Sequence, residues 1–341
     1  MSSTIAANLA AIASDDTLDA ATQEAAVALG EVEKSRERRE VNLAGMEPDR
    51  IHPVAYEFGA LFADVACEGA LIAARSSVVF VGMARSIGGI LPASIERIEL
   101  MAAHFASWGC VVIENDSNDN TKDVLHAWQE KWPDNVVADC CDLDRPHLHG
   151  WELERVKAYA EYRNKYVTIA KQRWPDVDWV IAVDLDAWGG WSRHGMINGI
   201  GWMARIPTAA GMASVSIYQA TDAKDNRLWA HYDQWAWRWH GWTQERMETW
   251  FTLWLPPPGA PPIAVRSAFG GMCIYRAKLI YNSKYNGDTD IEHVGLHRDM
   301  EKQGYGMYLN PGQRVLMHWL TEEQKSDGDE HGDGKRDDVQ A

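Results

Sequence analysis

Two carboxylates one residue apart, Asp184 and Asp186, end the apolar run at residues 180–183. In an extended chain residues i and i+2 point to the same side, so both side chains can converge on one point. Two like charges held that close need a cation, and a hard divalent ion that also carries substrate phosphates is the natural partner. We therefore expect Mn²⁺ or Mg²⁺ at this pair. The alternative is a capped turn followed by a solvated aspartate.

The elements around this pair indicate an α/β fold. Residues 180–183 are typical of a buried strand, and open α/β sheets bind ligands at the carboxyl ends of their strands. Apolar strands are also predicted at 78–81, 110–113 and 136–138. Helices are predicted at 53–74 and 151–174, from Pro92 to a left-handed cap at Gly109, and from about Thr121 to a stop before Pro133. Strands and helices that alternate at this spacing favour right-handed βαβ units and a mostly parallel, Rossmann-like sheet.

Composition restricts the classes of partner and compartment. The 341 residues are 46% hydrophobic, and the net charge of −16 disfavours non-specific binding to nucleic acid or to an anionic membrane. The five cysteines include no Cys-x-x-Cys pair, so neither a disulfide framework nor a zinc knuckle is indicated. No apolar stretch is long enough to span a bilayer. We expect a cytoplasmic protein without a membrane span.

The loop after the second predicted strand reads Glu-Asn-Asp-Ser-Asn-Asp-Asn-Thr and begins at Glu114. A carboxylate at a strand end can accept hydrogen bonds from a nucleotide base or from ribose hydroxyls. The following Asp, Ser, Asn and Thr residues suit a tight turn and the start of a helix. A well-capped loop would explain residues 117–121 entirely, but it explains Glu114 less easily.

Three motifs in order resemble one family. They are residues 111–121, the pair Arg163-Asn164 and the strand at 180–186, and together they resemble the nucleotide-sugar half of GT-A fold glycosyltransferases. The Glu-Asn-Asp-Ser variant is most similar to the fungal capsule-associated mannosyltransferase group and to related viral or bacterial proteins. The likeness covers roughly residues 78–318. One departure is Asp116, where many members have glycine.

The resemblance implies a donor site for a UDP- or GDP-linked sugar. Glu114 matches the carboxylate that contacts the base, and Asp184 with Asp186 matches the metal motif. Gly270-Gly271, ahead of an apolar strand, matches a pair that lies near the donor sugar, where glycine lets a backbone approach a ligand; a simple turn is the alternative. The full set assigned to the donor is Ala84, Arg85, Glu114, Asp116, Arg163, Asn164, Leu185, Gly270 and Gly271.

The resemblance also implies catalytic and metal residues near the end of the chain. Glu292 resembles the carboxylate that acts as base in inverting members, and Asp290 is a second catalytic candidate. After a turn at residues 310–312, His318 resembles a terminal metal ligand, with a satisfied core histidine as the alternative. His293 and His297 share a helical face, but a His-Glu-x-x-His order is absent, so we reject zinc protease chemistry.

Tryptophans gather in the second half, with seven between residues 229 and 254. Trp235, Trp237 and Trp239 alternate as on a strand. Because aromatic faces stack on sugars and on bases, we assign these three to acceptor binding. The core of a tryptophan-lined subdomain is the alternative.

The chain divides by composition into three parts. Residues 1–75 are predicted as a helical N-terminal arm, able to serve in oligomerisation, and residues 76–320 as the GT-A domain, with a nucleotide-sugar half at 76–190 and an acceptor half at 191–320. Residues 321–341 contain eight acidic and three basic residues and are predicted as a disordered tail.

The function expected from these features is metal-dependent transfer of a hexosyl or pentosyl group from a nucleotide-diphosphate sugar to an acceptor hydroxyl. The acceptor is a glycan or, as in some viral enzymes, a hydroxylated nucleobase, so nucleic acid enters as an acceptor only. A nucleotidyltransferase is the alternative enzyme, although the loop after the first strand is a poor Gly-rich basic loop. A non-catalytic carbohydrate-binding protein that uses the tryptophans is the third reading.

Overall fold

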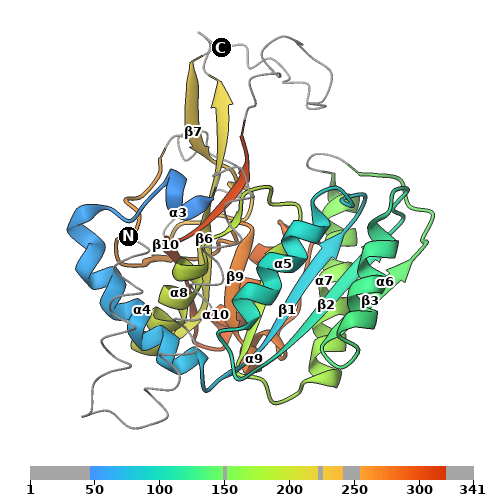
Figure 1. Ribbon diagram of the computed structural model, residues 1–341, viewed down its shortest axis with the longest axis horizontal. Coiled ribbons are helices and arrows are strands. Elements are labelled where there is room, and N and C mark those ends of the chain that lie inside the picture. Colours follow the sequence, from blue (N-terminus) through green and yellow to red (C-terminus); the bar gives the residue numbers. More distant parts are fainter. Residues whose placement is uncertain (1–46, 149–151, 222–225, 241–253, 320–341) are drawn as a thin grey trace.

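One sheet with helices on both faces organises the part of the chain that the computed structural model describes, residues 47–148, 152–221, 226–240 and 254–319 (Figure 1). Four parallel strands form its first half. They are β1 (Ser77–Ala84), β2 (Ser107–Asn115), β3 (Val136–Cys141) and β4 (Trp179–Asp184), in the spatial order β3-β2-β1-β4. All four predicted strands are therefore present.

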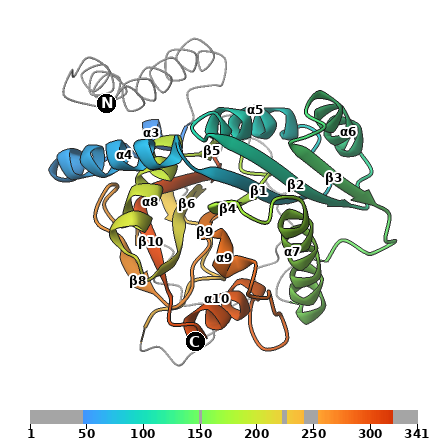
Figure 2. The same ribbon diagram turned by 90° about the horizontal axis from the view of Figure 1, so that it is seen from below.

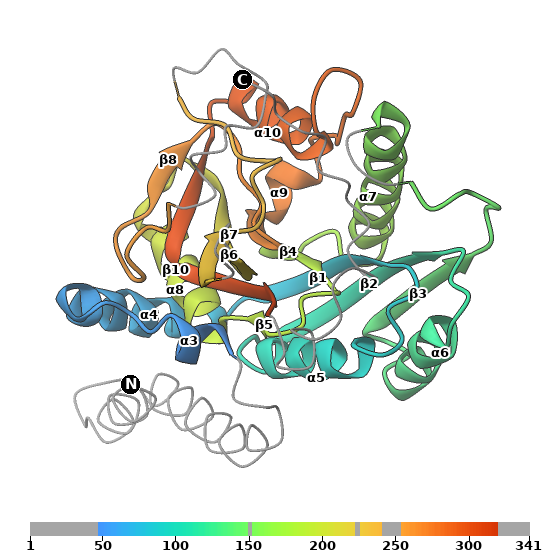
Figure 3. The same cartoon turned by 90° about the horizontal axis from the view of Figure 1, so that it is seen from above.

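Helices cover both faces of these strands. Figures 2 and 3 show α5 (Leu91–Ala102) and α6 (Thr121–Lys131) on one face and α7 (Leu153–Arg173) on the other. Side chains of β1 alternate between the two cores: Phe80 packs in the cluster that contains Leu91, and Val79 packs in the cluster that contains Tyr166. Because the connection through α7 returns to the opposite side of β1, the strand order reverses between β1 and β4. Such a switch point is where ligands bind in open α/β sheets.

The second half of the sheet is mixed. Strand β9 (Met272–Arg276) runs antiparallel between β4 and β6 (Ala209–Thr221), and β10 (Gly306–His318) runs parallel to β6. The remaining elements are β5 (Gly190–Trp191), α8 (Arg193–Arg205), β7 (Arg227–His231), β8 (Ile263–Val265), α9 (Ala277–Ile280) and α10 (Glu292–Lys302). The predicted α/β class, a Rossmann-like sheet flanked by helices, is confirmed; the first half of the sheet is parallel and the second half is mixed.

Two local predictions about turns are wrong. Gly109 is no helix cap: it lies inside β2, where a Cβ would meet the Trp174 ring at 2.6 Å, so close packing requires the glycine. Residues 310–312 do not reverse the chain. Strand β10 continues through them as a bulge, and its register with β6 jumps from Asn310 opposite Ser214 to Arg314 opposite Val215. Proline has no N–H to donate to a strand ladder, so inside a strand it is tolerated at a bulge, where the ladder is interrupted.

The described part of the predicted N-terminal arm packs into the domain. It consists of α3 (Pro48–Ile51), the 3-10 turn η2 (Tyr56–Phe58) and α4 (Gly59–Ala73), and α4 crosses α8 closely. At the crossing a Cβ on Gly69 would meet the Ile197 carbonyl oxygen at 2.0 Å, and one on Gly201 would meet the Val65 carbonyl oxygen at 2.2 Å. Residues on the two sides of the predicted boundary at residue 75 therefore pack against each other. Residues 1–46 of the predicted arm lie outside the described ranges.

We expect Gly69→Ala to lower the free energy of unfolding by about 1–3 kcal/mol, because the two helix backbones must separate to admit the methyl group. Gly59→Ala is the matched control in the same helix. Gly59 is helical with nothing within 4 Å of its Cβ position, so alanine there should raise stability by about 0.5 kcal/mol. Urea denaturation measures both. Equal effects of the two substitutions would contradict the close crossing.

Other sequence predictions fall partly outside the structure. The predicted tail at 321–341 and residues 241–253 of the tryptophan-rich segment lie outside the described residues. Among the helices in the described ranges, none combines the length and the hydropathy needed to cross a bilayer.

Candidate functional site

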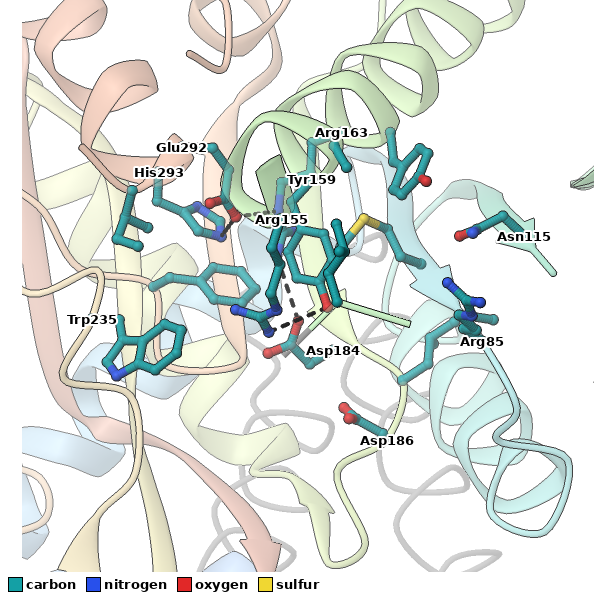
Figure 4. A pocket seen from close by; sticks show the side chains of 18 of the residues that line it. Arg85, Asn115, Arg155, Tyr159, Arg163, Asp184, Asp186, Trp235, Glu292 and His293 are labelled. Atoms are coloured by element: carbon teal, nitrogen blue, oxygen red, sulfur yellow. Dashed lines mark hydrogen bonds and ion pairs between the residues drawn. The ribbon is translucent and has the colours of Figure 1, made fainter. Parts of the chain in front are cut away.

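A cleft of about 610 Å³ opens where the strand order reverses, at the carboxyl ends of β1 and β4. Its walls come from α7, the loop at residues 145–148, the segment at 232–236 and the start of α10. Figure 4 shows Arg85 and Asn115 on one side of Asp184, and Trp235 and Glu292 on the other. The sheet edge predicted to bind ligands is thus the edge that is hollowed.

Asp184 and Asp186 both line this cleft. Only Asp184 belongs to β4, however, and Asp186 lies in the turn that follows, so strand alternation is not what brings the two together. The backbone N–H of Asp184 donates to the carbonyl oxygen of Gly271 at 2.9 Å, which holds the end of β4 in place. Leu185 points the other way: its side chain is buried in the core, and its carbonyl oxygen accepts the Ser94 hydroxyl at 2.6 Å. Only the backbone atoms of Leu185 could therefore contact the sugar-nucleotide donor to which the sequence assigned this residue.

Negative charge accumulates around Asp184. Burial, together with the nearby carboxylates of Asp186, Asp233 and Glu292, raises the pKa of Asp184 to about 7, although the guanidinium of Arg163 opposes the shift. A carboxyl group that is only partly ionised at neutral pH is under electrostatic strain, which a bound cation would relieve.

The carboxylate oxygens of Asp184 and Asp186 are ligands that suit a divalent ion, but no third protein ligand among the described residues joins them. Within the described ranges no group of three His, Cys, Asp or Glu side chains is placed to hold a metal. The ring of His318 packs beside Tyr218 and Tyr232, at centroid distances of 5.2 and 6.1 Å, and does not join the aspartates. A site with two carboxylates suits an ion whose other positions are filled by phosphate oxygens and water.

Arg163 connects the two ends of the site from within α7. Its side chain is buried, its Nε donates to Glu292 Oε1 at 3.0 Å, and one terminal nitrogen lies 3.8 Å from Asp184 Oδ1. The guanidinium also lies over the rings of Phe269 and Tyr285, at 5.1 and 5.8 Å. Burial lowers the pKa of Arg163, but the nearby Tyr166 hydroxyl and the Glu292 and Asp184 carboxylates outweigh it and raise the pKa well above its usual value. It is a fixed cation between two carboxylates.

Glu292 and Asp290, the two catalytic candidates, differ in position. Glu292 lines the cleft at the first residue of α10. Asp290 is not among the lining residues; its carboxylate pairs with Arg238 at 2.6 Å and with Arg298 at 3.3 Å and is 2% exposed. Two ion pairs and burial place Asp290 in the support of α10 rather than in the cleft.

Ala84 and Arg85, which the sequence assigned to the donor, lie in the cleft wall. The guanidinium of Arg85 donates to the carbonyl oxygens of Arg145 and Pro146, at 2.8 and 3.2 Å, so it also holds the opposite loop. Asp116 supports the same loop. It has a φ of 54°, the left-handed region that favours glycine, and its carboxylate accepts the backbone N–H groups of residues 143–145. The aspartate thus makes contacts that glycine could not.

Glu114 does not line the cleft. It is fully buried, and its Oε1 accepts the backbone N–H of Ser117 at 2.9 Å, which is the capped-loop alternative. The next residue, Asn115, lines the cleft instead. Adjacent residues of a strand face opposite sides of the sheet, and here the side of Asn115 is hollowed.

Three further donor-side candidates shape the backbone. The Asn164 side chain donates to the Tyr285 carbonyl oxygen and accepts the Tyr285 N–H, both at 2.9 Å. Gly270 and Gly271 have φ of 68° and 72°, and a Cβ on Gly270 would meet the Ser214 carbonyl oxygen at 1.8 Å. Contact with another strand therefore requires glycine at position 270, and the positive φ favours glycine at both positions. Gly271 also supplies the carbonyl that anchors Asp184.

Of the three tryptophans assigned to acceptor binding, only Trp235 lines the cleft. Trp237 is buried, and it packs with Trp239 and Trp254 at centroid distances of 5.4 and 5.7 Å. Residues 235–239 form no strand, so the expected alternation is wrong. The core alternative holds for Trp237 and Trp239.

Sequence reasoning missed several side chains that line the cleft, namely Arg145, Arg155, Tyr159, Tyr232, Asp233, Phe269 and His293. Arg155 lies over the rings of Tyr159 and Trp235, at 4.5 and 5.3 Å. Its i, i+4 spacing from Tyr159 on a predicted helix was the available signal. Nothing local marked Tyr232 and Asp233, which follow β7 in an irregular segment.

Comparisons with known proteins give matches among solved structures only; no protein-family model and no curated protein matches the sequence. The mannosyltransferase PcManGT from Pyrobaculum calidifontis, solved with GDP-Man and Mn²⁺, gives a TM-score of 0.44 at 13% identity and covers 92% of this chain and 68% of its own. GalNAc-T7, solved with UDP, GalNAc and Mn²⁺, gives 0.44 at 12%, covering 75% of this chain and 45% of its own. S. aureus TarS 1–349 gives 0.38 at 10%, covering 72% and 60%. At such identities the likeness says nothing of substrate or acceptor.

Proposed function

We propose that the chain is a metal-dependent glycosyltransferase that moves a sugar from a nucleotide-diphosphate sugar to an acceptor hydroxyl. The observation that carries this proposal is the joint placement, in one cleft at a sheet switch point, of the Asp184 and Asp186 carboxylates, several guanidinium groups and a buried Glu292. Each part meets one need of that reaction: an ion site, a polyanion site and a group to receive a proton.

The metal and phosphate parts are complementary. Asp184 and Asp186 would hold Mn²⁺ or Mg²⁺, and the ion when bound would neutralise charge on the diphosphate that leaves. Arg85, Arg145, Arg155 and Arg163 line the same cleft. The cleft also holds the carboxylates of Asp184, Asp186, Asp233 and Glu292, so these arginines offset its negative charge. With a divalent ion bound, the cleft would become locally positive in a chain of net charge −16, as binding of a polyanion requires.

The nucleotide would lie on the Asn115 side of the cleft, across Asp184 from Trp235 (Figure 4). Asn115→Ala should weaken binding of UDP or GDP by about tenfold, the effect of one or two lost hydrogen bonds, with little change in stability. Glu114→Ala is the matched neighbour: it removes a loop cap and should lower the melting temperature without changing nucleotide affinity. Calorimetric titration and thermal melts of both variants check this. The reverse pattern would return base recognition to Glu114.

The acceptor side is the Glu292 end of the cleft. Glu292 would take the proton of the attacking hydroxyl in an inverting transfer. Trp235, Tyr159 and the 46% exposed Tyr232 offer aromatic faces on which an acceptor sugar can stack. The acidic chain disfavours the phosphates of DNA, so a glycan suits this wall better than a hydroxylated nucleobase.

The deciding experiment is titration of the full chain with UDP and with GDP, with and without Mn²⁺, followed by hydrolysis assays on UDP- and GDP-linked hexoses and pentoses. We expect Mn²⁺-dependent binding of one diphosphate and slow release of that diphosphate from its sugar conjugate. Release of pyrophosphate from a nucleoside triphosphate plus a sugar phosphate would instead indicate a nucleotidyltransferase. Binding of glycans alone, without any nucleotide, would indicate a non-catalytic carbohydrate-binding protein.

A further inference from the structure

One histidine in the cleft forms no hydrogen bond within the part of the chain that the structure describes. His293 is the second residue of α10, lines the cleft beside Glu292 and is 2% exposed. Neither ring nitrogen has a hydrogen-bond partner among the described residues. Glu292 Oε1 lies 3.8 Å from Nε2, beyond hydrogen-bonding distance (Figure 4). A buried polar group left without a partner costs free energy, so it needs an explanation.

The protein holds this ring in a fixed orientation. Its face stacks on Phe269 with centroids 4.0 Å apart and an interplanar angle of 19°, and the ring meets Tyr285 edge-on at 5.4 Å. Arg163 lies over the same two aromatic rings. Packing therefore holds the ring in place, while no described residue hydrogen-bonds its nitrogens. This is the arrangement expected of a preorganised binding group in the absence of its ligand.

His297, one helical turn later, shows what a structural histidine looks like in the same helix. It is equally buried, and both its nitrogens are within hydrogen-bond distance of a hydroxyl, Nδ1 at 2.7 Å from Ser267 Oγ and Nε2 at 2.9 Å from Tyr275 Oη. The two residues share a helix face and burial, so the difference in hydrogen bonding is specific to the position that lines the cleft.

The charge state of His293 restricts the ligand. Burial, the Arg163 guanidinium and His297 lower the pKa of His293 well below its usual value, so the imidazole is neutral at physiological pH. A neutral imidazole offers one N–H donor and one acceptor nitrogen. Hydroxyl groups match both atoms, whereas a phosphate needs donors only and a cation needs acceptors only.

We propose that His293 binds a hydroxyl of the sugar that is transferred, and so sets the affinity for the sugar part of the donor. This inference rests on the proposed function. The position of His293 in the cleft supports the proposal. His293 and Glu292 lie on one side of Asp184, and Asn115 and Arg85 lie on the other (Figure 4). A donor with its base near Asn115 and its diphosphate at Asp184 would therefore direct its sugar toward His293.

The test uses His293→Phe, which keeps the stack on Phe269 and removes both nitrogens. Titrations with GDP, UDP, GDP-mannose, UDP-glucose and UDP-N-acetylglucosamine, each with Mn²⁺, separate the diphosphate from the sugar. We expect the wild type to bind one sugar conjugate more tightly than its diphosphate, and His293→Phe to lose about tenfold of affinity for that conjugate with its diphosphate affinity unchanged. Stability gives a second readout, because removing an unpaired buried polar ring should leave the melting temperature unchanged or higher.

His297→Phe is the matched control and should do the opposite, lowering the melting temperature by breaking two buried hydrogen bonds while the preference for the sugar conjugate persists. An unchanged preference in His293→Phe overturns the inference, as does a wild type that gains nothing from any of these sugars. A rise in acceptor KM with unaltered donor affinity also overturns it, because His293 would then serve the acceptor. A wild type that binds neither GDP nor UDP refutes the proposed function itself, which is a separate result.

Discussion

Replacing Asp184 with asparagine should abolish Mn²⁺-dependent binding of a nucleoside diphosphate and, in metal-free buffer at pH 8, make the protein more stable. The first effect follows because the amide cannot supply a charged oxygen ligand. The second follows from the pKa of Asp184, which is about 7 in the folded protein, whereas an unperturbed aspartate has a pKa of 3.8. The folded state holds this proton more tightly than the unfolded state, so ionisation opposes folding.

The sign of this effect fixes a pH window. Below about pH 4 the carboxyl is protonated in both states, so wild type and Asp184→Asn should melt alike. As the pH rises from about 4 to 7 the unfolded state loses the proton first, and the wild type loses stability that the variant keeps. Above pH 7 the gap is constant, at about 1–3 kcal/mol or several degrees of melting temperature after allowance for partial exposure.

Thermal melts at pH 4 and pH 8, with and without Mn²⁺ and diphosphate, measure all of this in one series. Asp178→Asn is the control at the opposite end of β4, where the carboxylate accepts the backbone N–H of Ser77 at 2.8 Å. It should leave metal binding intact. Retained Mn²⁺ dependence in Asp184→Asn, or a variant less stable than wild type at pH 8, would mean that the aspartate pair is structural.

The second large effect concerns Glu292. Glu292→Gln should lower kcat by about 10²–10⁴-fold, the usual contribution of a positioned general base, while diphosphate and metal affinity change little. The glutamine can still accept the Arg163 N–H that now reaches Oε1 at 3.0 Å, so the fold should persist with a modest loss of stability.

Asp290→Asn is the matched variant two residues earlier. It weakens the buried pairs with Arg238 and Arg298 and should lower the free energy of unfolding by about 1–3 kcal/mol, with turnover per folded molecule intact. Measuring turnover, diphosphate affinity and melting temperature on both proteins separates the two roles. Normal turnover in Glu292→Gln, or lost turnover in a well-folded Asp290→Asn, would reverse the assignment.

Part of the site was predictable because its signal is local. The apolar run before Asp184 forms β4, and the turn that follows it brings Asp186 to the cleft beside Asp184 while the Leu185 side chain enters the core. The helices and strands of the first half follow in the same way from runs of a few residues with period 2 or 3.6. A pattern of that length predicts its helix or strand without reference to distant parts of the chain.

Other assignments failed where two neighbours carry the same local signal. Glu114 and Asn115 both end β2, and only the packing of helices on each face of the sheet decides which one lines the cleft. Trp235 differs from Trp237 in the same way, because the ring cluster that buries Trp237 includes the distant Trp254. Polar residues at a strand end predict a site but not which of them faces it.

The sequence by itself determined the strand-helix order, the sheet edge and the aspartate pair, because these depend on contacts between residues a few positions apart. Tertiary structure alone decided that Arg163 lies between Asp184 and Glu292, a residue 129 positions away, and that His297 finds hydroxyl partners while His293 does not. Those outcomes depend on long-range strand pairing, above all on β9 inserting beside β4 and carrying the loop with Phe269 against α7 and α10. The sequence gives the chemical type of each side chain, but whether a buried polar atom finds a hydrogen-bond partner depends on residues that only folding brings together.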